Sequence, residues 1–306
     1  MKRRNFLKGS QLLFSGLLLS GGTANAMSDL SSQKSDRKRK LSFTIGHITD
    51  VHMPDEEIPR QKFGKCIDLI KKHKVDFFLN TGDSVMSIDG KDIVRETVLS
   101  QWKSWDQCME RLKGYEVYSC IGNHDIWWAA PNKEDEMYGV EYAAKRLKLP
   151  NRYYSFSKKN WKFIVLDGNN NGISLDEAQM KWLESELTNA GSAEHILVMA
   201  HYPILTVTNT WEGGQFNDHI KLKDLFYKHK DKVRVCISGH QHLVDNAEYN
   251  QVKYFCNGSM SGFWWGEGNK DSAARGFYQE SPAGYAILRL YDNGDVENQY
   301  IPHNLI

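Results

Sequence analysis

The stretch VYSCIGNHD, residues 117–125, joins a short apolar run to a glycine and three polar residues. The apolar run predicts a buried strand, and open α/β sheets carry their reacting groups in the loops at the carboxyl ends of such strands. Asn123 offers a neutral amide oxygen to a metal ion, and His124 offers a proton that titrates near neutral pH. Asp125 offers a carboxylate that can orient this histidine. The stretch therefore predicts a strand end that carries chemistry.

Strand and helix patterns alternate on both sides of this stretch, which predicts a layered α/β domain. An aromatic insertion at 126–151 and a glycine- and tryptophan-rich loop at 262–266 interrupt the pattern. We expect helices at 60–73, 93–113, 175–187 and 218–229, and strands at 41–48, 75–79, 117–121, 153–156, 161–166, 195–200, 233–237, 251–256, 284–291 and 295–301.

Four other predicted strands also end in residues that can bind metal ions. Side chains two apart on an extended segment point the same way, so Asp50 and His52 can face one centre, as can His240 and His242. The glycines that precede Asp83, Asn123 and His240 allow tight turns and close backbone approach. The candidate ligands are Asp50, His52, Asp83, Asn123, His201, His240 and His242.

These donors are carboxylate, amide and imidazole groups without a thiolate, a mixture that suits Mn, Fe or Zn rather than Ca or a structural cysteine-type Zn site. Seven ligands exceed the needs of one ion. They suit two divalent ions about 3.5–4 Å apart, with one carboxylate between them. With two aspartates and a bridging hydroxide, such a site keeps about one net positive charge, which attracts a phosphate ester.

Each motif also has an ordinary structural explanation. Gly-Asp at 82–83 is a common turn dipeptide, GHQH at 239–242 can be a surface loop, and His201 can be a hydrogen-bonded core histidine. Five of the eleven histidines nevertheless follow predicted strands in one order, which favours a shared site. The other six, at 47, 73, 195, 219, 229 and 303, are assigned no function.

Together, the ordered motifs resemble the five-motif signature of the calcineurin-like metallophosphoesterases, over about residues 43–245. The resemblance implies a four-layer α/β/β/α sandwich, and hydrolysis of phosphate esters by a hydroxide that bridges two metal ions. It also implies that Asp83 bridges the ions, that His124 is the acid and that Asp125 orients it. One ion would be held by Asp50, His52, Asp83 and His242, and the second by Asp83, Asn123, His201 and His240.

The substrate is expected to be a small-molecule phosphate ester. The Asp-x-His start and short spacings are similar to the bacterial branch that includes cyclic-nucleotide phosphodiesterases, so phosphodiesters are the first choice. A phosphomonoesterase or nucleotide hydrolase is the alternative, followed by a non-catalytic metal-binding module. A zinc β-lactamase-like enzyme would need His-x-His-x-Asp-His, whereas residues 239–244 read GHQHLV. Loop aromatics either stack on the substrate or pack the insertions: Trp127, Trp128, Tyr138, Trp211, Trp264 and Trp265.

The first 26 residues have the layout of an export signal: a basic start, an apolar stretch and small residues at the end. Arg3 and Arg4, followed by NFLK, resemble the bacterial twin-arginine signal, and an ordinary secretion signal is the alternative. We expect a twin-arginine-type signal at 1–26, a flexible linker at 27–40, and a metallophosphoesterase domain with a C-terminal strand extension at 41–306. The mature protein is expected in the periplasm or outside a bacterium, without stable membrane insertion after signal removal.

The composition also limits the kinds of binding partner and of cysteine chemistry that we expect. The net charge of +1 gives no bulk attraction to a nucleic acid polymer. The five cysteines lack C-x-x-C spacing, and we expect small buried apolar residues rather than a disulfide or zinc framework. No pattern in the sequence indicates the oligomeric state.

Overall fold

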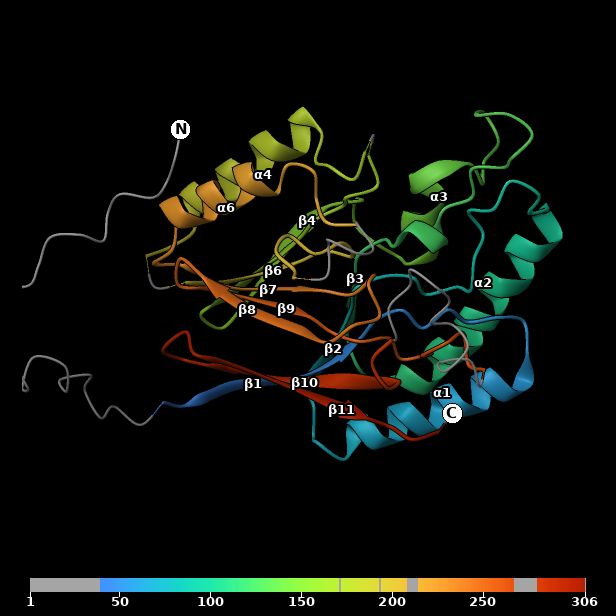
Figure 1. Cartoon of the computed structure of the whole chain (residues 1–306), viewed down its shortest axis with the longest axis horizontal. Coiled ribbons are helices and arrows are strands. Elements are labelled where there is room, and N and C mark those ends of the chain that lie inside the picture. Colours follow the sequence, from blue (N-terminus) through green and yellow to red (C-terminus); the bar gives the residue numbers. More distant parts are fainter. Residues whose placement is uncertain (1–38, 171, 193, 208–213, 267–279, 306) are drawn as a thin grey trace, which may run out of the picture. The chain divides into compact units, whose positions relative to one another are not determined.

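Two β-sheets pack face to face, and each has helices on its outer face (Figure 1). The computed structural model describes residues 39–170, 172–192, 194–207, 214–266 and 280–305, and residues 39–306 form one compact unit. The proposed signal and most of the linker lie outside the described residues. Within the described ranges, no helix has the length and apolar character that crossing a bilayer requires.

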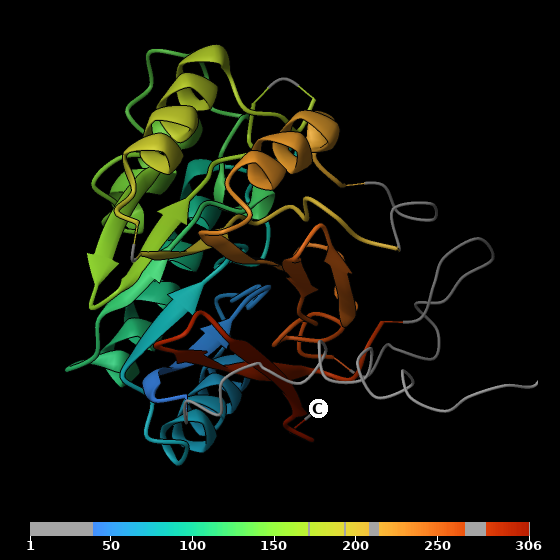
Figure 2. The same ribbon diagram turned by 90° about the vertical axis from the view of Figure 1, so that its left-hand side faces the viewer.

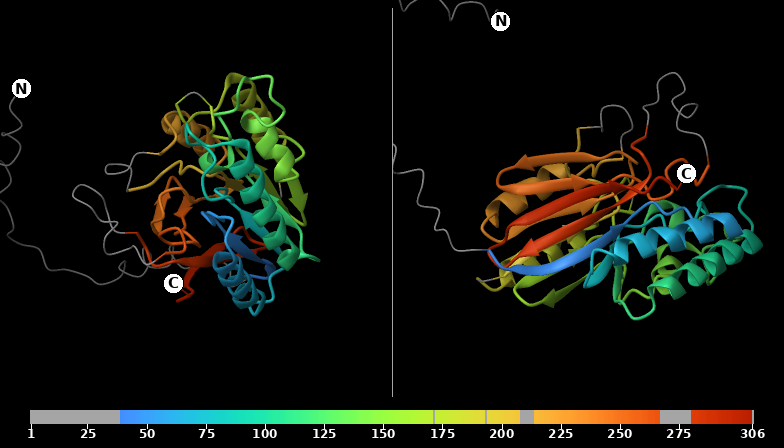
Figure 3. Two further views of the ribbon diagram at one scale, coloured as in Figure 1. Left: turned by 90° about the vertical axis from the view of Figure 1, so that its right-hand side faces the viewer. Right: turned by 90° about the horizontal axis from the view of Figure 1, so that it is seen from below.

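The first sheet has its parallel strands in the middle and at one side. β1, β2 and β3 run parallel, while β10 pairs antiparallel with β1 and with β11 (Figure 3). Nearly every residue of β1 is buried, as expected for a central strand covered on both faces. The strand order is β11 (Val296–Pro302), β10 (Gly284–Tyr291), β1 (Leu41–Ile48), β2 (Phe77–Asn80) and β3 (Val117–Ser119).

The second sheet is parallel through its centre, with an antiparallel strand at each edge. One edge strand, β8, was not expected from the sequence because its residues DNAEY are mostly polar and do not form an apolar run. The order is β4 (Tyr154–Lys158), β5 (Trp161–Val165), β6 (His195–Met199), β7 (Val233–Ser238), β9 (Val252–Cys256) and β8 (Asp245–Tyr249).

Helices cover the outer face of each sheet. On the second sheet, α4 (Glu177–Asn189) and α6 (His219–Lys228) lie side by side (Figure 2). The first sheet is covered by α1 (Glu57–Lys71), α2 (Arg95–Met109) and α3 (Gly139–Arg146). The helix α3 lies inside the segment that the sequence analysis treated as an irregular insertion.

Three apolar cores separate the four layers. Phe63 of α1, Trp102 of α2 and Phe78 of β2 belong to the core between helices and the first sheet. A middle core joins the inner faces of the two sheets, and a third lies under α4 and α6. The expected four-layer α/β/β/α sandwich is confirmed. All five cysteines are buried and unpaired.

Candidate metal centre

The loops after five parallel strands meet at one end of the two sheets. The Asp50 N–H donates to the carbonyl of Gly82 at 3.0 Å, and the Gly239 N–H donates to the carbonyl of His201 at 3.0 Å, so pairing continues beyond the strands. The two sheets are joined where the His240 N–H donates to the Asp50 carboxylate at 3.0–3.1 Å. All seven ligands expected from the sequence therefore lie in adjoining loops.

One cluster of donor atoms contains Asp50, His52 and His242. The Nε2 atoms of the two histidines lie 3.0 Å apart, and Asp50 Oδ1 is 3.4 Å from Nε2 of His242 and 3.9 Å from Nε2 of His52. All three residues are buried. Two imidazoles and a carboxylate that converge in a largely buried cluster are a suitable ligand set for a divalent transition-metal ion.

A second cluster contains Asp83, His201 and His240, with Asn123 beside it. His201 Nε2 lies 3.2 Å from Asp83 Oδ2, 3.0 Å from Asn123 Oδ1 and 3.1 Å from His240 Nδ1. These four residues are the ones that the family resemblance assigns to the second ion.

Asp83 lies between the two clusters. Its Oδ2 is 3.2 Å from His201 Nε2 on one side and 3.7 Å from His52 Nε2 on the other. Its Oδ1 accepts the His124 N–H at 2.9 Å, which fixes the plane of the carboxylate. One carboxylate shared by two donor clusters matches the bridge of a two-metal site.

The outer nitrogens of the histidines support metal binding. His52 Nδ1 lies 3.0 Å from the carbonyl of Met86, and His201 Nδ1 lies 2.8 Å from the carbonyl of Thr81. A carbonyl at Nδ1 selects the tautomer whose Nε2 carries a lone pair, and both Nε2 atoms point into the clusters. The residues present therefore fit a pair of divalent ions.

Five of the fourteen non-glycine residues with positive φ in the described part of the chain are candidate ligands in these loops. A non-glycine residue with positive φ costs of order 1–3 kcal/mol where the conformation is sparsely populated, and such residues gather at functional sites. Gly122 also permits a close approach, since a Cβ atom there would lie 2.1 Å from Asp83 Oδ1. Positive φ angles occur at Asp50 (51°), His52 (44°), Asp83 (52°), His240 (71°) and His242 (53°).

Protonation in the site follows burial and the aspartate charges. Burial lowers the pKa of His52 and of His240 to about 3, so both imidazoles are neutral and able to ligate. Burial also lowers the pKa of His201, but the charge and hydrogen bond of Asp83, the Asp50 charge and the Thr81 carbonyl together outweigh it and raise that pKa to about 9. A divalent ion that binds here displaces that proton, which makes metal binding pH-dependent.

The partner of His124 differs from the expectation. Its Nδ1 lies 2.8 Å from Asp89 Oδ1, whereas the sequence analysis expected Asp125 to orient the ring. Residues 123–125 form a single 3₁₀ turn, which sends consecutive side chains in different directions. The Asp125 carboxylate is fully buried and shapes the loops instead, by accepting backbone N–H groups of Ser84, Val85 and Gly122 at 2.8–3.2 Å.

Asp89 is the acidic residue that the sequence analysis missed. It follows Asp83 by six residues in an irregular segment, and only the folded loop brings it to His124. Burial lowers the pKa of His124, but the Asp83 charge and the Asp89 hydrogen bond outweigh this and raise that pKa above its ordinary value.

Trp264 forms an aromatic wall over the first cluster. Its ring centroid lies 4.1 Å from that of His52 and 5.3 Å from that of His124. Trp127 and Trp265, in contrast, are buried and donate their indole N–H groups to backbone carbonyls, so they pack the loops onto the core. Trp211 lies outside the described residues.

A cavity of about 420 Å³ opens beside the second cluster. Asn123 forms part of its wall, and Trp128 contributes an indole that is 46% exposed. The Trp128 ring meets Tyr138 edge-on at 5.5 Å. The remaining lining is neutral: Gly168, Asn169, Asn170, Ile173 and Tyr202.

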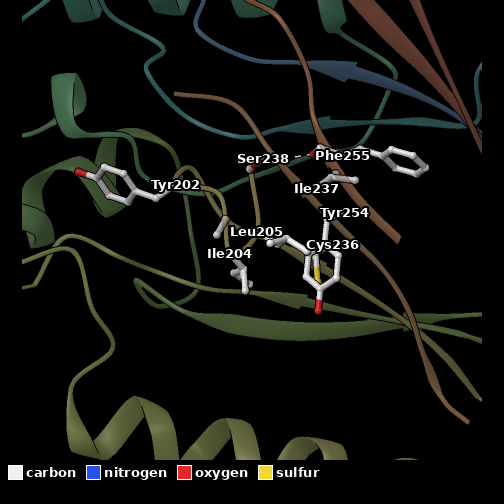
Figure 4. Close-up of a pocket in the computed structure, with 9 residues that line it drawn as sticks. Tyr202, Ile204, Leu205, Cys236, Ile237, Ser238, Tyr254 and Phe255 are labelled. Carbon is white, nitrogen blue, oxygen red and sulfur yellow. Dashed lines mark hydrogen bonds between the residues drawn. The ribbon is translucent and has the colours of Figure 1, made fainter. Parts of the chain in front are cut away.

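A second, smaller pocket is lined by Ala200 and Tyr202, the chain neighbours of His201, and is mostly apolar. Ile204, Leu205, Cys236 and Tyr254 face it, and Ser238 donates to the Phe255 carbonyl at 3.5 Å (Figure 4). Its lining groups hold the ends of β6, β7 and β9 together, which makes it part of the core that supports the metal-binding loops.

Comparison with known proteins identifies the family of the chain. Residues 43–244 match the family model of the calcineurin-like phosphoesterases. The chain is 21% identical over 267 residues to a probable cyclic nucleotide phosphodiesterase from Ruthia magnifica subsp. Calyptogena magnifica, covering 85% of this chain and all of that one.

Two solved structures share the fold. A dimetal phosphatase from Danio rerio has a TM-score of 0.57 at 15% identity, over 87% of this chain and all of that chain. GAP50, described as the anchor in the inner membrane complex of Plasmodium, has a TM-score of 0.56 at 17% identity, over 87% and 86% of the two chains. At these identities the likeness concerns the fold.

Proposed function

The chain belongs to the calcineurin-like phosphoesterase family and is a hydrolase of phosphate esters, and we propose that its preferred substrates are phosphodiesters. The observation that carries the proposal is the pair of donor clusters with Asp83 between them, and a neutral cavity beside the second cluster. Bound in these clusters, two Mn, Fe or Zn ions would supply Lewis-acid chemistry and the activated water for hydrolysis.

His124 is the acid of this proposal. Its ring lies against His52 at a centroid distance of 5.0 Å, beside the clusters but bonded through Nδ1 to Asp89. The raised pKa favours the protonated ring, whose proton can be passed to the leaving oxygen. Asp89 positions the imidazole and stabilises its charged form.

The cavity beside Asn123 supports a diester over a monoester. A phosphodiester carries one negative charge and a second organic group, whereas a monoester near neutral pH carries about two charges that cationic side chains usually bind. Among the described residues that line this cavity, none is Lys or Arg, and Trp128 offers an aromatic face. A neutral ring such as a nucleobase or sugar would fit there by stacking and amide hydrogen bonds.

The proposal is tested by comparing kcat/KM for bis(4-nitrophenyl) phosphate, 4-nitrophenyl phosphate, cyclic nucleotides and nucleoside monophosphates on one Mn-loaded preparation. We expect the diesters to be favoured by at least about tenfold, which is about 1.4 kcal/mol. Faster hydrolysis of the monoesters would establish the alternative, a phosphomonoesterase or nucleotide hydrolase. Two bound ions with no turnover of any ester would identify a non-catalytic module.

Export is a second part of the proposal. It is supported by the basic start, apolar stretch and small-residue end of residues 1–26, and by the RRNFLK sequence at 3–8. In a bacterial host, the mature chain should appear in the periplasm or medium. Replacing Arg3 and Arg4 together by Lys should retain it in the cytoplasm. Unchanged export of that variant would indicate an ordinary secretion signal.

A further inference from the structure

We propose that Glu280 positions His242 and strengthens binding of the metal ion held by the Asp50 cluster. Glu280 Oε1 lies 3.0 Å from His242 Nδ1, and His242 Nε2 faces His52 Nε2 at 3.0 Å. The carboxylate therefore holds the outer nitrogen of a ligand whose inner nitrogen points into the cluster. The inference rests on the dinuclear site of the proposed function.

The chain around Glu280 is fixed to the loop that carries His242. The Ser281 N–H donates to the His242 carbonyl at 3.0 Å, and Ser281 Oγ accepts the Val244 N–H at 2.9 Å. The next carbonyl, of Pro282, accepts the Tyr300 hydroxyl at 2.7 Å. These contacts fix the backbone next to Glu280, so little backbone conformational entropy is lost when the carboxylate contacts the imidazole.

A carboxylate at this position differs from the partners of the other ligand histidines. His52 and His201 have backbone carbonyls at Nδ1, whereas His242 has the Glu280 carboxylate there. A carboxylate fixes the tautomer and raises the basicity of the ligating nitrogen more than a neutral acceptor does. Glu280 should therefore strengthen binding of the ion that His242 ligates, and leave the affinity for the other ion nearly unchanged.

The charge balance supports the same conclusion. Glu280 is only 16% exposed, and its Oε2 is buried without a hydrogen-bond partner among the described residues. Asp50, on the far side of His242, is a second buried carboxylate. Two buried negative charges around one imidazole are costly unless a cation compensates them, and a divalent ion bound at Nε2 would be such a cation.

Glu280 lies outside the part of the chain that matches the family model, which ends at residue 244. The family match alone therefore does not account for this contact. Trp264, which also follows residue 244, lies over the His52 ring. The C-terminal part of the chain therefore contributes two side chains to the surroundings of the Asp50 cluster.

The test is a Mn²⁺ titration of the metal-free chain, followed by electron paramagnetic resonance and by competition with a chelator. In Glu280→Gln, we expect one ion to bind about 10–100-fold more weakly and the other within about threefold of wild type. Glu248→Gln is the matched control, because it removes the charge of an exposed glutamate in β8, and it should bind both ions nearly as wild type does.

Unchanged affinity for both ions in Glu280→Gln, or an equal loss for both, would overturn the inference. If that variant does not fold, Glu280→Asp serves instead. It keeps the negative charge but at a longer distance from His242, so the affinity for the same ion should fall by a smaller factor. Wild-type protein that fails to bind two ions would refute the proposed function instead, so the two failures are distinct.

Discussion

Replacing Asp89 by Asn tests the link between His124 and the leaving group. The substitution keeps the size of the side chain but removes the charge that lies 2.8 Å from His124 Nδ1. A hydrogen bond to a charged group contributes about 1.5–3 kcal/mol. We take the lower part of that range, about 1.5–2 kcal/mol, because the two side chains are 23% and 30% exposed and solvent weakens the pair.

That energy corresponds to a fall of about 10–30-fold in kcat. Without Asp89, the His124 pKa falls, so the alkaline limb of the kcat profile should move to lower pH. The loss should be larger for a cyclic nucleotide, whose sugar oxygen needs a proton to leave, than for a 4-nitrophenyl ester, whose leaving group is stable as an anion.

The assay measures kcat against pH for both substrates at saturating Mn²⁺, with metal content checked on the same samples. Asp92→Asn, an exposed acidic residue in the same segment, is the charge-matched control and should behave as wild type. An Asp89→Asn enzyme that keeps its kcat and its alkaline limb, or that loses activity only in proportion to lost metal, would refute the reasoning.

Three other predictions address the loops, the cavity and the core. Gly122→Ala places a Cβ 2.1 Å from Asp83 Oδ1, so Mn²⁺ affinity should fall at least about tenfold; normal affinity would show that the loop can relax. Trp128→Ala should raise KM for aromatic diesters about 3–10-fold with little change in kcat, and Trp128→Phe should restore most of the binding. An unchanged KM would show that the substrate does not bind in this cavity. Burial lowers the pKa of His47 to about 4, so this residue alone should decrease the free energy of unfolding by about 3 kcal/mol as pH falls from about 6.5 to about 4. Urea unfolding of His47→Gln should show a flatter pH dependence, and an equal acid loss would contradict this role of burial.

The layers and the ligand set could be predicted from the sequence because both depend on local pattern. Apolar runs such as 117–121 end directly in polar residues, and parallel strands bring such ends to one edge. The strand β8 was missed because an edge strand needs little apolar surface, and α3 because it has only 8 residues and lies inside an aromatic segment.

The partners of the ligands depend on contacts between distant segments, and short sequence patterns do not report them. Asp125 is adjacent to His124 in the chain, but the 3₁₀ turn directs the two side chains apart, and Asp89 takes the expected place. Glu280 reaches His242 across 38 residues. Trp127 and Trp128 are neighbours of the same type, and only the fold separates the buried ring from the exposed one.

The most direct test of the account is the number of metal ions bound by the wild-type chain and their magnetic coupling. The two clusters joined by Asp83 predict two Mn²⁺ ions per chain, about 3.5–4 Å apart. Their electron paramagnetic resonance spectrum should be that of a spin-coupled pair, and Asp83→Asn should abolish the coupling. One ion per chain, none, or two uncoupled ions in the wild-type protein would contradict the account.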